Sequence, residues 1–549
     1  MLASWFWGVV LVLAMAGTGH AAPVDSSPAT PAAVPLFDDL GTYHHPITTK
    51  SAKAQQYFDQ GLRFVYGFNH DEAIRAFKEA ARLDPKCAMA YWGIAYALGP
   101  NYNLPLDDER NQAAFAALGR AVALAPHASK REQAYIAALA KRYSLAPDAD
   151  RKTLDRSYAD AMRALARKYP DDLDAATLYA ESLMDLRPWD LWTSDGQPQP
   201  GTLEIVETLE AVLAKDPNHP GANHYYIHAV EASPHPERGL ASAARLKSLV
   251  PGAGHLVHMP AHIYMRVGRY ADAADANTQA IAVDRVYLER VKPEGVYPMM
   301  YYPHNIHFLW AAASMEGRSE EAIRSGREVA GGVTEEMVRE MPMVEYYAPT
   351  GYFALVRFGR WEDMLREPEP PETMPYVRGM WHYGRGLAFA ATNRLDDADA
   401  EQARVAAAAA ETPRDRIIGD NTPAAQVLQL ASEVLAGEIA FRRGESDAAV
   451  RHLNEAVRMQ DQLPYTEPPP WYYPVRQSLG AVLLAGGRPA EAEAVYVEDL
   501  KRNPENGWSL YGLAQSLRAQ QKNDEAAAAD ARFRQAWGRA DITLTASRF

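Results

Sequence analysis

Histidines are concentrated in one stretch of this sequence. Nine of the sixteen lie between residues 219 and 307: His219, His224, His228, His235, His255, His258, His262, His304 and His307. Several are three or four residues apart, as His224 and His228 or His258 and His262 are. In a helix such pairs share one face, close enough for two imidazoles to bind the same ion. The spacing therefore predicts metal chemistry.

The ligand types narrow the choice of metal. Imidazoles with few carboxylates suit zinc, copper, nickel or iron rather than calcium or magnesium. The cofactor we expect is a transition metal, namely copper, zinc or iron. Nearby methionines (Met259, Met265, Met299 and Met300) would suit copper(I), although methionine in an alanine-rich helical chain also serves as core filler. Two other interpretations stay open: a histidine surface that binds a peptide or responds to pH, and histidines that only pack.

The elements that position these histidines follow a repeated pattern. Residues 54–87, AQQYFDQGLRFVYGFNHDEAIRAFKEAARLDPKC, set two helical patterns around a short polar turn. Small residues such as Gly61 let paired helices approach, Phe77 fills the space between them, and Pro85 ends the second helix. The same pattern of small and large residues returns at Gly480, Leu483, Ala492, Tyr496 and Pro504.

This pattern resembles the tetratricopeptide repeat, a helical hairpin of about 34 residues. With the first position at Ala54, the family's packing positions fall on Gly61, Phe64, Ala73, Phe77, Ala80 and Pro85. Degenerate copies are recognisable at 114–126, 209–217, 220–251, 254–284, 303–322, 379–398 and 430–456. The resemblance covers residues 51–540 and implies an all-α, right-handed superhelical solenoid of about nine or ten hairpins, with an extended concave groove.

The resemblance also implies where the histidines point. In the family, positions 2, 5 and 9 of the first helix of a repeat are among those that face the groove. With position 1 at Pro220, Gly254 and Pro303, these positions hold seven histidines: His224, His228, His255, His258, His262, His304 and His307. By composition, nine such positions would hold only about a quarter of one histidine. We therefore predict one metal-binding surface, centred on His224, His228, His258 and His262.

Two further residues bear on this surface. Glu231, at a groove position of the repeat that begins at Pro220, is the one acid placed to act as a ligand, an orienting partner or a general acid–base. Pro260 would break a helix unless it lies in the first turn, so a helix is expected to start near Met259 and to leave His255 in the preceding loop. Seven histidines exceed one four-coordinate site, so either two ions or one ion with an acid–base or substrate-binding set is expected.

Insertions interrupt the repeat period. In a solenoid they become loops, and they lie at 99–108, 185–202, 287–302, 367–375 and 463–473. Three contain the aromatic, proline-rich runs RPWDLW, VYPMMYYP and EPPPWYYP, which either fold over the groove or cap the packing.

Composition bounds the partners and the location. The net charge of -14, with acidic and basic residues interspersed, argues against a nucleic-acid groove. Residues 1–21 read as a secretory signal peptide, which predicts a periplasmic or secreted protein without stable membrane insertion after cleavage. A linker and N-terminal cap (22–50), the solenoid (51–540, with the histidine-rich groove at 219–307) and a tail (541–549) follow.

Two functions remain at this point. One is an exported repeat protein that binds one or more transition-metal ions through histidines of its concave surface, with metal-dependent catalysis left open. The other is a periplasmic scaffold that binds a peptide, protein or small-molecule ligand in its groove. We find no nucleophile elbow, phosphate-binding loop, HExxH or CxxC motif, so the sequence indicates no particular reaction.

Overall fold

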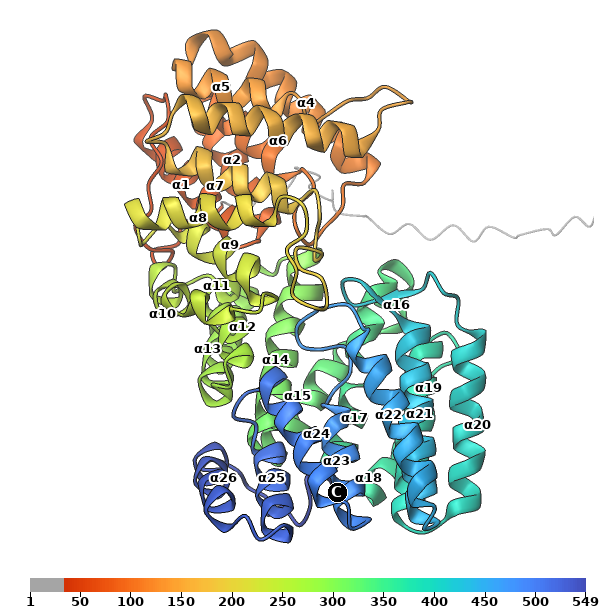
Figure 1. Ribbon diagram of the computed structural model, residues 1–549. Helices are drawn as coiled ribbons and strands as arrows, with labels where there is room; N and C mark the ends of the chain where they lie inside the picture. Colours follow the sequence, from red (N-terminus) through yellow and green to blue (C-terminus); the bar gives the residue numbers. More distant parts are fainter. Residues whose placement is uncertain (1–33) are drawn as a thin grey trace, which may run out of the picture. The chain divides into compact units, whose positions relative to one another are not determined.

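The computed structural model describes residues 34–549. The predicted signal peptide, residues 1–21, and the linker up to residue 33 lie outside the described residues. Helices dominate, and consecutive helices pack against each other along the chain as helical hairpins (Figure 1). The all-α repeat fold predicted from the sequence is confirmed.

The first part of the described chain precedes the histidine-rich segment and is built from helices. They are α1 (Ala52–Tyr66), α2 (His70–Leu83), α3 (Ala88–Ala97), α4 (Asp108–Leu124), η1 (Ala125–His127), α5 (Lys130–Leu139), α6 (Arg151–Lys168), α7 (Leu173–Met184) and α8 (Thr202–Lys215).

The middle part carries the histidines. Its elements are α9 (Pro220–Glu231), η2 (Pro236–Gly239), α10 (Leu240–Leu249), α11 (Gly254–His258), α12 (Pro260–Arg266), α13 (Tyr270–Val291), η3 (Tyr297–Tyr301), α14 (Tyr302–Glu316), α15 (Ser319–Gly331), α16 (Glu335–Glu340) and η4 (Pro342–Tyr347).

The last part completes the array. It holds α17 (Thr350–Arg357), α18 (Trp361–Arg366), α19 (Pro375–Ala391), α20 (Leu395–Glu411), β1 (Ile417–Ile418), β2 (Thr422–Pro423), α21 (Ala424–Arg442), α22 (Ser446–Asp461), α23 (Val475–Ala485), α24 (Pro489–Arg502), α25 (Gly507–Ala519) and α26 (Asn523–Ala536). The pairs α5–α6 and α17–α18 lie between the repeat copies that the sequence reveals.

Close helix contacts depend on the small residues that the repeat pattern marks. A Cβ atom placed on Gly61 of α1 would lie 2.5 Å from the ring of Phe77, and one on Gly93 of α3 would lie 2.6 Å from the same ring. Phe77, on α2, is therefore clasped between the helices before and after it. Tyr496 of α24 takes the same place between Gly480 and Gly512. Contacts between glycine and a large ring therefore hold the helices together near both ends of the described array.

Segments at both ends of the array are tied to it. His45, before α1, approaches Asp174 of α7 with its Nδ1 2.6 Å from the carboxylate. After α26, Asp541 accepts hydrogen bonds from the backbone N–H groups of Ser319 (2.7 Å) and Glu320 (3.0 Å) at the start of α15. Further along, the Ser547 hydroxyl donates to the Gln477 carbonyl (2.7 Å).

No helix among residues 34–549 is long and apolar enough to cross a bilayer.

Candidate metal centre

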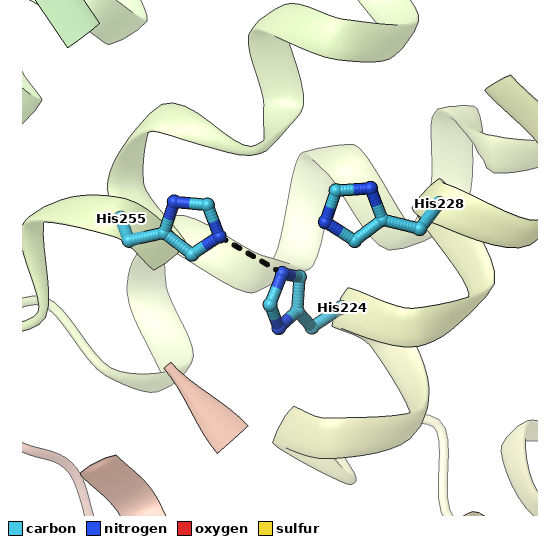
Figure 2. A group of neighbouring side chains, drawn as sticks. All are labelled: His224, His228 and His255. Carbon is cyan, nitrogen blue, oxygen red and sulfur yellow. Dashed lines mark hydrogen bonds between the residues drawn. The ribbon is translucent and has the colours of Figure 1, made fainter. Parts of the chain in front are cut away.

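Six imidazoles come together where α9, α11, α12 and α14 meet. They belong to His224, His228, His255, His258, His262 and His304, which we call the histidine cluster. Figure 2 shows His224 and His228 on one helix, with His255 facing them from its neighbour. The ring centroids of His224 and His228 are 4.9 Å apart, and those of His258 and His304 are 4.8 Å apart. Six of the seven predicted groove histidines therefore share one centre.

Two of the helices that carry the cluster begin with a proline. Pro220 opens α9, where its missing N–H is not needed, and His219 caps the helix by accepting from the Ala222 N–H (3.1 Å). Pro260 opens α12, but Met259 before it keeps right-handed helical angles. His258 and His262 therefore lie one turn apart, as predicted. His255 lies in α11 rather than in a loop, because the helical turn before Met259 is retained.

Fixed acceptors orient two of the rings. The Nδ1 of His224 donates to the backbone carbonyl of Tyr66 (2.6 Å). The Nδ1 of His258 donates to Asn277 Oδ1 (2.6 Å), while the Asn277 amide donates to the Ala273 carbonyl (2.8 Å) and so holds its oxygen toward the imidazole. An imidazole that donates from Nδ1 presents the lone pair of Nε2 in its neutral form. Both Nε2 atoms are thus prepared as ligands.

Glu231 orients two more rings. Its carboxylate accepts from the Nδ1 of His228 (2.8 Å) and, with the other oxygen, from the Nδ1 of His262. The His228 Nε2 is buried and has no hydrogen-bond partner among the described residues. Carboxylate–histidine pairs of this kind fix the tautomer and the ring orientation of metal ligands. Glu231 therefore supports both halves of the cluster at once.

The oriented nitrogens face one another. The Nε2 atoms of His258 and His262 are 2.8 Å apart, and those of His224 and His255 are 3.1 Å apart. In the first pair both Nδ1 atoms already carry the proton of a neutral ring, so two lone pairs meet. That arrangement repels unless a cation or a proton lies between the nitrogens. Such a site favours a positive ion.

The ligand atoms form two sets of three. His224, His228 and His255 make one set, and His258, His262 and His304 make the other; the ligand atoms within each set lie within 4.8 Å of one another. Small ring rotations would bring three nitrogens to the about 2.0–2.1 Å that zinc–imidazole bonds require. Three protein ligands leave a coordination position open, as catalytic metal sites do.

Burial opposes protonation of several imidazoles of the cluster. Burial lowers the pKa of His224, His255 and His258 well below the ordinary value of histidine. Burial also lowers the pKa of His262, although Glu231 opposes the shift. For Glu231 burial raises the pKa, but His262 and His228 outweigh it and bring it to about 2. Metal ions bind unprotonated imidazoles and ionised carboxylates, so these shifts favour a metal site.

A pocket opens beside the cluster. It spans about 570 Å³, part of it open to solvent, and His228, His255, His262 and His304 form one wall. The other walls come from all three parts of the chain: Asn103, Trp189, Met300, Tyr301, Met343, Val344, Tyr346, Tyr347, Gly419, Asp420 and Glu467. Trp189, Tyr301 and Glu467 belong to the predicted insertions, so these loops line the groove rather than only capping the packing.

His307 lies apart from the other six. Its ring stacks on Trp310 (4.9 Å between centroids, 4° between planes) and meets Tyr346 and Tyr347 edge-on at 5.0 and 5.4 Å. His304 and His307 are three residues apart on α14, so their directions differ by about 60° around the helix. The sequence register assigned both to one surface. The structure places only His304 with the other cluster rings.

Several contributing residues were not apparent from the sequence. The orienting acceptors Asn277 and Tyr66 lie on a second repeat helix and at the end of α1, where nothing in their local pattern marks them. Tyr346, Tyr347 and Asp420 lie in η4 and in the turn between β1 and β2, outside any recognised repeat copy. Trp189 and Glu467 carry only a weak signal in the sequence, because they lie in insertions for which folding over the groove is one of two expectations.

A second group of polar side chains surrounds Asp174. Its carboxylate accepts from the Tyr43 hydroxyl (2.7 Å), from Tyr66 and from His45. His45, Asp172 and Asp174 could geometrically hold an ion. Because hydrogen bonds from Tyr43, Tyr66 and His45 already use the Asp174 oxygens, this group ties the N-terminal segment to α1 and α7.

The sequence matches the tetratricopeptide repeat family at residues 58–98 and 478–540. None of the curated proteins matches the chain. Among solved structures it is similar to the human IFIT1 dimer with m7Gppp-AAAA, at 12% identity, 89% coverage of this chain, 91% of that chain and a TM-score of 0.34. The human IFIT1 dimer with PPP-AAAA is 11% identical, with 89% of this chain and 91% of that chain covered and a TM-score of 0.32.

Structural similarity at these low TM-scores supports no inference about the ligands of this chain. The two matched regions include α1 to α3 and α24 to α26, where Phe77 and Tyr496 are clasped between glycines. The repeat positions read from the sequence and the family match therefore agree: the chain carries tetratricopeptide repeats.

Proposed function

We propose that this protein binds transition-metal ions in the histidine cluster. One observation carries the proposal: four imidazoles donate from Nδ1 to fixed acceptors, so that their Nε2 lone pairs are directed into one buried centre. A histidine that only packs does not need a matched acceptor on the far side of its ring. Metal ligands have such partners almost without exception.

The arrangement suits up to two ions. His224, His228 and His255 would hold one, and His258, His262 and His304 would hold the other, with Glu231 joining the two sets from behind. All six ligands are imidazoles, which favours zinc, copper or iron over calcium or magnesium. Both oxygens of Glu231 are engaged by ring N–H groups, which favours an orienting role over that of a free acid–base.

The open coordination positions suggest chemistry at the pocket. An ion held by three imidazoles acts as a Lewis acid on water or on a bound ligand. His262 and His304, from one set, and His228 and His255, from the other, all line the pocket. A ligand in the pocket would therefore reach either ion, which supports metal-dependent catalysis or ligand capture.

Elemental analysis tests the proposal. Protein purified without chelators, or loaded with Zn²⁺ or Cu²⁺ and desalted, is expected to hold about two equivalents of metal, one for each set of three histidines. The double variant His228→Ala, His262→Ala takes one ligand from each set, and its metal affinity is expected to fall by at least about tenfold. His235→Ala, an exposed histidine paired with Glu237, is the matched control. Background metal content with no uptake on titration would overturn the proposal.

The repeats also support a role in protein interaction. Tetratricopeptide arrays are interaction scaffolds, and aromatic side chains line the pocket of this one. We propose a peptide or protein partner as the second candidate function. Isothermal calorimetry with proteins captured by the immobilised chain tests it, and binding that persists in the His228→Ala, His262→Ala variant would separate this role from metal binding.

Export is a further part of the proposal. It is supported by an apolar run of about 15 residues that is followed by small residues at Gly19 and Ala21 in the sequence. Sequencing the N-terminus of the protein from its native source, after separation of periplasm and cytoplasm, tests it. Cytoplasmic protein that keeps residues 1–21 would contradict export.

A further inference from the structure

The pocket beside the histidine cluster contains acidic side chains that have no lysine or arginine partner among the described residues. Asp420 and Glu467 line it, and no lysine or arginine of the described chain lines it with them. Neither carboxyl forms an ion pair with a lysine or arginine within residues 34–549. Acidic groups that are taken out of water without a cation are costly, and proteins normally pair them or give them a ligand.

We propose that this pocket binds a small organic amine, with the ammonium group at Asp420 and Glu467 and an apolar body against the aromatic walls. The proposal names the ligand class for the open side of the metal centre, and in that respect it rests on the proposed function. The amine site itself consists of residues outside the histidine cluster.

The two carboxyls have defined positions. Asp420 accepts from the Thr466 hydroxyl (3.1 Å), and Glu467 accepts from the Tyr465 hydroxyl with its Oε1. The other oxygen of Glu467 lies 3.9 Å from His262 Nδ1, beyond hydrogen-bonding distance. Glu467 is only 4% exposed, so its free oxygen faces the pocket and the cluster rather than bulk solvent. Both acids line the same pocket, so an ammonium group bound there can donate to their oxygens.

The aromatic walls are held rigidly. The Tyr346 hydroxyl donates to the Pro468 carbonyl (2.9 Å), next to Glu467, and the Gly419 N–H donates to the Met343 carbonyl (3.0 Å), next to Asp420. These bonds join the acid-bearing turns to η4, which carries the tyrosines. Trp189 is fixed by its N–H, which donates to Asn103 (3.1 Å). Fixed rings favour a cation or an apolar group within about 6 Å of their faces.

Other ligand classes fit less well. In the metal-free chain, a carboxylate or phosphate would find no basic side chain on the walls and would face two acids. A neutral alcohol of the same shape would fill the aromatic part but would leave the acids without a cation. For the metal-free chain the expected order of affinity is therefore amine, then alcohol, then carboxylate.

Calorimetry with three ligands of equal shape tests this order. Phenethylamine, 2-phenylethanol and phenylacetate are titrated into the full chain as isolated and again after metal removal with a chelator. The amine is expected to bind at least about tenfold more tightly than the alcohol in both states. Equal affinities of the amine and the alcohol, tighter binding of phenylacetate than of the amine by the metal-free chain, or no binding of the amine at millimolar concentration would overturn the proposal.

Variants locate the ammonium site. Glu467→Gln and Asp420→Asn are each expected to weaken amine binding by about tenfold and to leave binding of the alcohol unchanged. Glu433→Gln, a carboxyl paired with His452 outside the pocket, is the control. If amine binding is unaffected in folded Glu467→Gln and Asp420→Asn chains, the proposal fails. If either chain does not fold, the ligand order in the unmodified protein decides.

The outcomes separate this inference from metal binding. Metal content is measured by elemental analysis on the same samples. Amine binding in a chain that takes up no metal would leave the amine site standing and remove the metal centre. Two equivalents of metal with no preference for the amine would support the metal centre and overturn the amine site.

Discussion

Glu231 holds two imidazoles with one carboxylate. It accepts from the Nδ1 atoms of His228 and His262, one from each set of three ligands. A carboxylate is the only side chain of this size that accepts on both sides, because an amide has one acceptor and one donor end. The tautomer of two rings therefore depends on this residue.

Glu231→Gln tests that dependence. The amide NH₂ would face a ring N–H, which forces one imidazole to move its proton to Nε2 and removes that nitrogen as a ligand. The metal affinity of one set is expected to fall by about 10–100-fold while the other set keeps its ion. Titration followed by elemental analysis measures this, with Glu237→Gln on the exposed His235 pair as control. Unchanged affinity at both sets would contradict the orienting role.

His307 gives a prediction about pH. Burial lowers the pKa of His307 to about 3, whereas the unfolded chain protonates it near the ordinary value of about 6.5. The unfolded state therefore binds the extra proton between these values, and His307 reduces stability as the pH falls below about 6.5. His307→Phe keeps the stacking on Trp310 and removes the proton site.

Relative to the unmodified chain, His307→Phe is expected to gain about 1.4 kcal/mol in free energy of unfolding for each pH unit below about 6.5. Urea unfolding of chelated protein between pH 5 and 7.5 measures the difference. A difference that does not change with pH would show that the folded chain protonates His307 as readily as the unfolded chain does.

Among the elements, the hairpins depend on contacts between glycine and a large ring. Phe77 and Tyr496 each fill a space that glycines on the preceding and following helices leave open. Here the sequence is informative, since a small residue opposite a large one within a helical pattern marks where two helices meet. These contacts explain why the hairpins at both ends could be predicted before the structure.

Gly512→Ala should damage such a contact. Its methyl group would overlap the ring of Tyr496, and the free energy of unfolding is expected to fall by about 1–3 kcal/mol. Gly119→Ala, in α4, is the matched control: a Cβ there meets nothing within 4 Å, so helix propensity should stabilise the chain by up to about 1 kcal/mol. If both substitutions had the same effect, the ring contact would not be what matters.

The histidine cluster shows how far sequence reasoning reaches at the level of elements. His224, His228, His258 and His262 could be placed together because repeat register and helix periodicity agree for α9 and for α11–α12. His307 could not be separated from His304, because the direction of α14 depends on η3, which precedes it and follows no repeat pattern. The roles of Asn277 and Asp420 could not be predicted from the sequence, since only tertiary packing brings these residues to the site.

At the scale of the whole molecule, the metal ligands and the pocket walls have different origins. The six ligands lie within residues 224–304, on neighbouring hairpins. The pocket walls come from residues as far apart as Asn103 and Glu467. In repeat arrays each hairpin mainly stabilises its neighbours. Metal binding should therefore strengthen one part of the array rather than the whole.

Hydrogen exchange followed by mass spectrometry tests this regional effect. Chelation is expected to lower protection in α9 and α11 to α14, by up to about 2.7 kcal/mol for an ion present at 100 times its Kd. Protection in α21 and α22 should stay within error, because these helices carry no ligand. Equal changes along the chain would indicate that the array unfolds as one cooperative unit.

The wide spread of the pocket walls also sets an order of assembly. Contacts between hairpins that adjoin in sequence form early in folding, whereas contacts that close long loops form late, because loop closure costs chain entropy. The ligands on α9 to α14 would then be in place before Glu467 and Asp420 arrive. A newly made chain would present an accessible ion site first and a walled pocket second, so that an ion enters before the ligand that is to meet it.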